Sequence, residues 1–210
     1  MGWWFWVVRR PGCTVLVDCG CPDLQRAREW EITRFRRADE LLDSVGVSPA
    51  DVDALVLTHG HWDHAGGASL FPDAPVWIRQ AELDWWRSEV DGGRPEREGL
   101  RAADLAEIEG RVHALGDAVA EPWPGVRLMP GGAHTQGAQW VQVDDVALAS
   151  DNAYVYDNLD GPTPVGACVD AAANVEAIRQ MLTCAHVVPG HDPAVADRYP
   201  EIAPSVFRIR

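Results

Sequence analysis

Apolar residues occur along the chain in short runs, separated by turns and by amphipathic stretches. The runs at 3–8 and 14–20 are rich in aromatic and β-branched residues, and a Pro-Gly turn at 11–12 lies between them. This pattern predicts two strands paired as a hairpin. From 29 to 45 the apolar positions recur at helical spacing as far as Gly46, which predicts a helix that ends there.

The rest of the chain continues this alternation of strands and helices. A serine cap, a short helical turn and a buried strand are expected at 48–58. Further strands are predicted at 75–79, 125–130, 139–143, 146–151 and 185–192, helices at 80–90 and 172–183, and exposed loops at 91–99 and 131–138. Two similar halves of this kind predict a layered α/β sandwich. Because no repeat or compositional change marks a boundary, residues 1–210 are expected to form a single domain.

The composition of the chain limits the cellular location and the kinds of partner that we expect. Hydrophobic residues make up 47% of the chain, but no apolar run approaches the roughly 18 residues that a membrane span needs. The apolar start has no basic region before it and no small-residue cleavage site after it, so we read it as a strand and expect a cytoplasmic protein without a membrane partner. The net charge of −14 argues against nucleic acid as a partner.

The five cysteines are odd in number and scattered, and none forms the C-x-x-C spacing of zinc ribbons or redox motifs. We therefore expect free thiols. Cys19 and Cys21 form a C-x-C pair, which we interpret as incidental beside a richer set of metal-binding residues. Their role is left open.

That richer set begins in the stretch THGHWDHAGG at 58–67, which places three histidines and an aspartate within six positions. Imidazole nitrogen and carboxylate oxygen are ligands that zinc accepts. In an extended loop His59 and His61 can face one point, while Asp63 and His64 face a second. The spacing therefore predicts two adjacent metal ions just beyond the carboxyl end of a strand.

Later loops supply the remaining ligands that two ions about 3.5–4 Å apart require. His134, Asp151 and His191 each follow a predicted strand, and they bring the expected ligand set to seven. Two other histidines are given ordinary roles: His113 is expected to be a half-exposed strand residue, and His186 a strand residue with its polar atoms satisfied.

These dispersed stretches, in this order, resemble the metallo-β-lactamase superfamily over nearly the whole chain. The resemblance implies a four-layer αββα sandwich with a dinuclear site between its two sheets. It assigns three ligands to one metal and three to the other, with one carboxylate bridging both. In this chain the first set is His59, His61 and His134, the second is Asp63, His64 and His191, and the bridge is Asp151.

Residues that differ between groups of the superfamily narrow the choice of reaction. The true β-lactamases carry cysteine or serine where this chain has Asp151, and the di-iron oxygen reductases carry glutamate where it has His61. Zinc-dependent hydrolysis is therefore the reaction that we expect. The stretches around the ligands, with the Asp-x-x-Tyr of Asp151 and Tyr154, are most similar to the N-acyl homoserine lactonase group, in which the tyrosine hydroxyl points at the substrate carbonyl.

The resemblance thus predicts a lactonase with two Zn²⁺ ions. Zinc lowers the pKa of bound water from about 15.7 to about 7, and the resulting hydroxide is expected to attack the lactone carbonyl. Asp63 and Asp151 would orient that hydroxide and pass its proton, while Tyr154 would donate to the carbonyl oxygen. The alternatives are a glyoxalase II-like thioesterase or other small-ester hydrolase with the same ligands, and a non-catalytic scaffold on the same fold.

Three further expectations concern the substrate and the assembly. The chain opens later than the lactonases it resembles, and Trp62 lies inside the metal loop, which favours a compact or ring-bearing lactone. Ala133 and Gln136 replace the residues usual in the His134 loop and are expected to change its stiffness without removing the ligand. Exposed aromatic residues at the amino terminus are expected to favour a homodimer.

Overall fold

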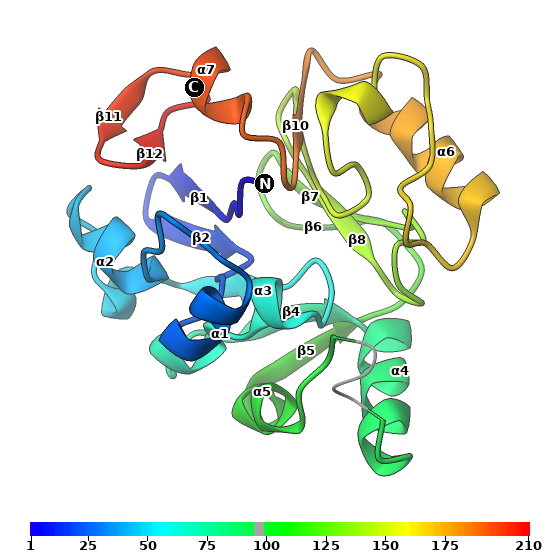
Figure 1. Cartoon of the computed structure of the whole chain (residues 1–210), viewed down its shortest axis with the longest axis horizontal. Helices are drawn as coiled ribbons and strands as arrows, with labels where there is room; N and C mark the ends of the chain where they lie inside the picture. Colours follow the sequence, from blue (N-terminus) through cyan, green and yellow to red (C-terminus); the bar gives the residue numbers. More distant parts are fainter. Residues whose placement is uncertain (95–98) are drawn as a thin grey trace.

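The computed structural model describes residues 1–94 and 99–210, and its body consists of two five-stranded sheets packed face to face (Figure 1). The predicted connection at 91–99 lies in part, at 95–98, outside the described residues. None of the helices in the described ranges combines the length and apolar composition needed to cross a membrane.

The two sheets follow one another along the chain. The first contains, in spatial order, β1 (Trp6–Arg10), β2 (Cys13–Val17), β3 (Ala54–Val56), β4 (Val76–Arg79) and β5 (Val112–Leu115). The second contains, from one edge to the other, β10 (His186–Pro189), β9 (Val146–Ser150), β8 (Gln139–Val143), β7 (Val126–Pro130) and β6 (Ala120–Trp123). In the first sheet β1 is antiparallel to β2 and the other pairs are parallel, whereas in the second sheet β9 and β10 form the parallel pair.

Seven α-helices lie within the described residues. They are α1 (Leu24–Glu29), α2 (Ala38–Asp43), α3 (Trp62–Ala65), α4 (Gln80–Asp91), α5 (Ala102–Ile108), α6 (Ala171–Met181) and α7 (Val195–Arg198). Helices α2, α4 and α5 pack on the first sheet and α6 packs on the second (Figure 1). Short 3₁₀ turns occupy Pro49–Asp51, Ala68–Leu70, Glu109–Arg111 and Tyr156–Asn158, and a small hairpin of β11 (Glu201–Ala203) and β12 (Val206–Phe207) follows α7. The four-layer αββα sandwich is therefore confirmed.

Strand β2 shows how the sequence produces these layers. Its side chains alternate between faces, so Val15 and Val17 enter the core between the sheets while Leu16 enters the core beneath the helices. All three are fully buried. A strand covered on both faces therefore reads as the continuous apolar run seen in the sequence.

The helix predicted from 29 to 45 is wrong, because the chain forms α1 and α2 with a non-helical segment between them. Helix α1 ends in a Schellman motif: Glu31 adopts φ 52°, its N–H bonds to the Arg28 carbonyl at 3.1 Å, and the Ile32 N–H bonds to the Ala27 carbonyl at 2.8 Å. Glycine usually holds this left-handed position, and a glutamate there leaves no recognisable stop signal in the sequence.

The strand predicted at 3–8 is also shifted, since β1 begins only at Trp6. The preceding aromatic residues pack on the chain itself. Trp6 is buried, and the rings of Trp4 and Phe207 meet edge to face at 5.7 Å. Trp3, Trp4 and Phe5 are half-buried and not fully exposed, and the homodimer stays a prediction.

Candidate metal centre

The seven predicted ligand residues meet at one end of the two sheets. His59 follows β3, His134 follows β7, Asp151 directly follows β9 and His191 follows β10. Each of these side chains is buried. Because strand ends on both sheets open toward the same edge, residues far apart in the sequence become neighbours there.

One cluster consists of three imidazoles. His61 Nδ1 lies 3.1 Å from His59 Nε2 and 3.1 Å from His134 Nε2. The Asp151 Oδ2 atom completes this cluster at 3.4 Å from His134 Nε2 and 3.8 Å from His59 Nε2. Four ligand atoms thus surround one point.

A second cluster lies on the other side of Asp151. His64 Nε2 is 3.2 Å from Asp63 Oδ2, and His191 Nε2 is 3.6 Å from the same oxygen. The Asp151 Oδ1 atom lies 3.0 Å from His64 Nε2 and 2.9 Å from His191 Nε2. The two oxygens of Asp151 therefore face different clusters.

These spacings fit metal ions. Ligand atoms at about 2.0–2.2 Å from one tetrahedral ion lie about 3.3–3.6 Å apart, which is close to the separations within both clusters. His64 Nε2 and Asp151 Oδ1 are also completely buried and only 3.0 Å apart, yet neither makes a geometrically acceptable hydrogen bond. Buried polar atoms without partners are costly, and here they converge where a cation would satisfy them.

Backbone carbonyls fix the orientation of two of the rings. The His134 Nδ1–H donates to the Ala167 carbonyl at 2.7 Å, and the His191 Nδ1–H donates to the Gly2 carbonyl at 2.8 Å. Because a carbonyl can only accept, Nδ1 must carry the proton, and the Nε2 lone pair of each ring faces its cluster.

Asp18 holds a third ring and was not singled out from the sequence. It follows β2, is fully buried, and accepts from His64 Nδ1 at 2.8 Å, from the Thr58 N–H at 2.8 Å and from the Ser150 hydroxyl at 3.0 Å. These contacts connect β2, the loop after β3 and the end of β9. The signal available in the sequence was a lone aspartate at the end of an apolar run, inside the segment 14–20 that was predicted as a strand.

Burial and charge divide the histidines into two kinds. Burial lowers the pKa of His59 and His134, and it lowers the pKa of His61 to about 4, so these rings are neutral and able to bind a cation near pH 7. Burial alone would also lower the pKa of His64, but neighbouring carboxylates, first among them Asp151, outweigh it and raise that pKa. The second cluster therefore combines its nitrogens with stronger negative charge.

Glu82 joins the two loops that carry the first cluster. It lies on α4, is fully buried, and accepts from the Gly60 N–H at 2.9 Å, from the Thr135 hydroxyl at 2.7 Å and from the Gly137 N–H at 2.9 Å. Burial raises the pKa of its carboxyl group. Sequence reasoning missed Glu82, because a glutamate in an amphipathic helix reads as a surface residue.

Asn174 performs a similar task from α6 and was also missed. This buried side chain donates to the Gly132 carbonyl at 2.5 Å and to the Asn152 carbonyl at 3.0 Å, and it accepts from the Val165 N–H at 2.9 Å. It thereby fixes the loop before His134 relative to the loop after β9.

Tyr154 lies at the edge of the centre, between the rings of His134 and His191, with ring centroids 5.7 Å from each. Its hydroxyl is 3.3 Å from His134 Nδ1. Burial, together with the negative charges of Asp151 and Asp63, raises the pKa of this phenol. The hydroxyl therefore keeps its proton at neutral pH and can donate a hydrogen bond.

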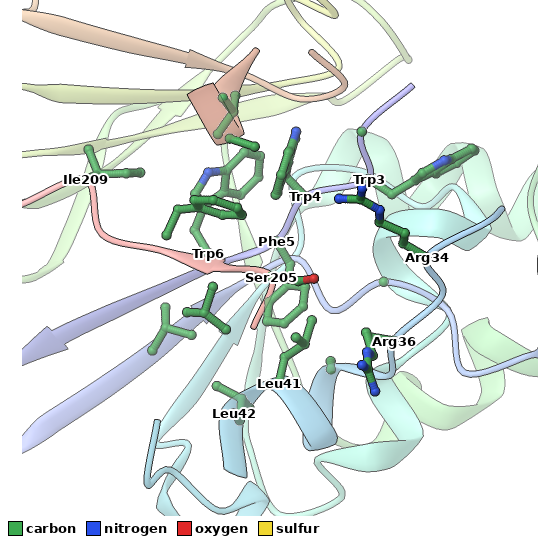
Figure 2. A pocket seen from close by; sticks show the side chains of 18 of the residues that line it. Trp3, Trp4, Phe5, Trp6, Arg34, Arg36, Leu41, Leu42, Ser205 and Ile209 are labelled. Atoms are coloured by element: carbon green, nitrogen blue, oxygen red, sulfur yellow. The ribbon is translucent and has the colours of Figure 1, made fainter. Parts of the chain in front are cut away.

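Tryptophans form a wall beside the second cluster. Trp62 is buried in α3, and its ring lies 5.4 Å from that of Trp3 and 5.5 Å from that of Trp30. A cavity of about 1280 Å³ runs past this wall and past Asp63 toward Phe5, in the region that Figure 2 shows. Residues Trp62 and Asp63 of the 58–67 stretch therefore line a large, partly aromatic cavity.

The residues given ordinary roles lie outside both clusters. His113 is an exposed residue of β5 that stacks on Trp77 with ring centroids 4.9 Å apart, and His186 begins β10 with an exposed side chain. All five cysteines are unpaired. Cys19 is buried and its Sγ–H donates to the His64 carbonyl at 3.1 Å, while Cys21 Sγ accepts from a backbone N–H at 3.5 Å.

Comparison with known proteins agrees with this architecture. The sequence model of the family described as "Metallo-beta-lactamase superfamily" matches residues 4–194. An N-acyl homoserine lactonase of Bacillus sp is 25% identical over 179 residues, covering 77% of this chain and 68% of that protein. An N-acyl homoserine lactonase of Azorhizobium caulinodans is 30% identical over 171 residues, covering 71% of this chain and 62% of that protein.

A solved structure shares the fold. It is that of an N-acyl homoserine lactone hydrolase with the product N-hexanoyl-L-homoserine bound at its catalytic metal centre. Its TM-score is 0.75 at 20% identity, and the match covers 95% of this chain and 84% of that one.

An αββα sandwich with a histidine and aspartate cluster at the strand ends defines a class of hydrolases. The chain belongs to the metallo-β-lactamase superfamily.

Proposed function

We propose that residues 1–210 act as a single domain that binds two Zn²⁺ ions and opens a small lactone or a related ester by hydrolysis. The observation that carries this proposal is the position of Asp151, whose two oxygens face separate clusters of ligand atoms. A carboxylate shared in this way suits a pair of adjacent ions better than one ion. The similarity to lactonases supports the choice of substrate.

Bound divalent ions supply Lewis acidity, which activates water and polarises an ester carbonyl. The protein's own groups have distinct tasks beside them. Asp63 and Asp151 accept and hold the proton that leaves the attacking water. The Tyr154 hydroxyl donates to the carbonyl oxygen as negative charge develops there. The carbonyl and carboxylate partners of the histidines keep the ring nitrogens aimed at the centre.

The tryptophan wall favours a compact or ring-bearing lactone over one with a long acyl chain. Flat indole surfaces such as those of Trp3, Trp30 and Trp62 pack well against rings. If acyl homoserine lactones are accepted, the reaction is quorum quenching. The cytoplasmic location stays a prediction of the sequence.

A substrate panel on the zinc-loaded protein tests the proposal. It compares short- and long-chain acyl homoserine lactones, aromatic lactones, S-lactoylglutathione and a chromogenic β-lactam. We expect turnover of lactones and none of the β-lactam. Preferential hydrolysis of S-lactoylglutathione would establish the thioesterase alternative, and preference for long chains by orders of magnitude would contradict a compact substrate. No turnover of any ester would favour the non-catalytic scaffold.

A further inference from the structure

The segment Gly2–Trp4, called the strap below, runs beside the loop that carries His191. The Gly2 N–H donates to the His191 carbonyl at 2.8 Å, and the Gly2 carbonyl accepts from His191 Nδ1 at 2.8 Å. The indole Nε1–H of Trp4 donates to the Asp192 carbonyl at 3.0 Å. Three hydrogen bonds therefore join residues that lie almost 190 positions apart in the sequence.

Ring packing adds to this attachment. The indole of Trp3 meets the His191 ring edge to face, with centroids 5.1 Å apart, and Trp3 also contacts Trp62 beside Asp63. Figure 2 shows the side chains of Trp3 and Trp4 pointing to different sides of the strap. Trp3 thus lies toward the second cluster, while Trp4 anchors the strap away from it.

Glycine at position 2 is needed for this arrangement. A Cβ placed there would overlap the indole of Trp4, with only 2.8 Å to Cε2. The indole cannot move aside freely, because the Asp192 carbonyl and the ring of Phe207 hold it. A side chain at position 2 must therefore displace either Trp4 or the Gly2 carbonyl that orients His191.

We propose that the strap is a positioning element for the second metal ion and that it acts through His191. This inference rests on the proposed dinuclear centre. The hydrogen bond to the Gly2 carbonyl selects the tautomer and the ring angle of His191, and Trp3 limits rotation of the ring. No comparable contact joins the strap to His59, His61 or His134 in the described part of the chain, so the effect should be selective for one ion.

Titration of the metal-free protein with Zn²⁺, in competition with a chromogenic chelator, resolves the two binding steps. We expect Gly2→Ala to weaken the second step about 10- to 100-fold, as loss of an orienting partner does elsewhere, and to leave the first step unchanged. Trp4→Leu removes the indole that a Cβ would strike. The double variant should therefore bind the second ion as Trp4→Leu does, with Gly2→Ala adding nothing.

Two controls keep the outcome clear. Ile108→Val, in the core beneath the helices, lowers stability without altering a residue of the strap or of either cluster, and should leave both steps unchanged. Gly2→Pro removes the N–H that bonds to His191 and should also weaken the second step. Unchanged second-step affinity in both Gly2 variants, or equal weakening of both steps, overturns the strap proposal. A wild-type protein that binds fewer than two ions instead overturns the dinuclear centre.

Discussion

The Asp18 carboxylate accepts a hydrogen bond from His64 Nδ1 at 2.8 Å, on the opposite side of the ring from Asp63 and Asp151. Asp18→Asn keeps the size of the side chain but removes the charge that orients this ring. We expect about 10- to 100-fold weaker zinc binding with the fold retained. Calorimetric titration together with circular dichroism checks this, and unchanged affinity would show that Thr58 and Ser150 suffice to hold the loop.

Asp151→Ala should lower metal content and activity together. Both clusters lose a ligand when this one side chain is removed, because each of its oxygens faces a different cluster. Elemental analysis after zinc reconstitution, beside steady-state rates, measures the two effects. Asp157→Ala, an exposed aspartate nearby, serves as the control. Full zinc occupancy in Asp151→Ala would contradict the bridging role.

Tyr154→Phe should reduce turnover about 10- to 100-fold with metal content unchanged. A lost donor of this kind costs up to about 10²–10³ in rate, but metal ions would stabilise the same oxygen, so the smaller effect is expected. A purely structural tyrosine predicts normal kinetics and a lower Tm. Rates and thermal unfolding measured on the same variant separate these two roles.

Glu82→Gln should destabilise the protein. Glu82 accepts three hydrogen bonds in a buried site, and a glutamine amide must place N–H groups against donors there. A buried polar mismatch of this kind costs about 1–3 kcal/mol. Thermal unfolding measures the loss, with Asp84→Asn on the exposed side of the same helix as the control. Equal Tm values for the two variants would contradict the linking role of Glu82.

Removal of metal should lower the Tm of the wild-type protein by about 5–10 °C. A ligand at about 100 times its Kd stabilises the folded state by about 2.7 kcal/mol, and each kcal/mol shifts the Tm of a chain of this size by about 2–4 °C. Unfolding curves with and without a chelator, followed by zinc addition to restore the Tm, test this. A Tm that does not change when the chelator is added would argue against a bound metal ion.

The sequence predicted most of the sheet framework, and the seven residues it proposed as ligands lie together in two clusters. Local patterns could indicate them because several directly follow apolar runs, as His59 and Asp151 do, and because four of them lie within six positions. The chemistry of the centre is therefore visible in local patterns of residues.

The supporting residues could not be predicted in the same way. Asp18, Glu82 and Asn174 act through contacts across 9 to 132 positions, and nothing local distinguishes them from surface polar residues. The break between α1 and α2 was missed for another reason, since Glu31 adopts a conformation that its identity does not indicate. Helix α5 and strand β6 were not anticipated either.

The four candidate ligands of the 58–67 stretch follow a strand of the first sheet, whereas His134, Asp151 and His191 lie in loops of the second. A chain that has completed only its first half would carry a partial chelating group and no complete site. Ions bound in the folded protein would cross-link the two halves of the chain and resist their separation. Loss of the ions would then favour a partly unfolded state in which the two sheets separate from each other while each half keeps its own structure.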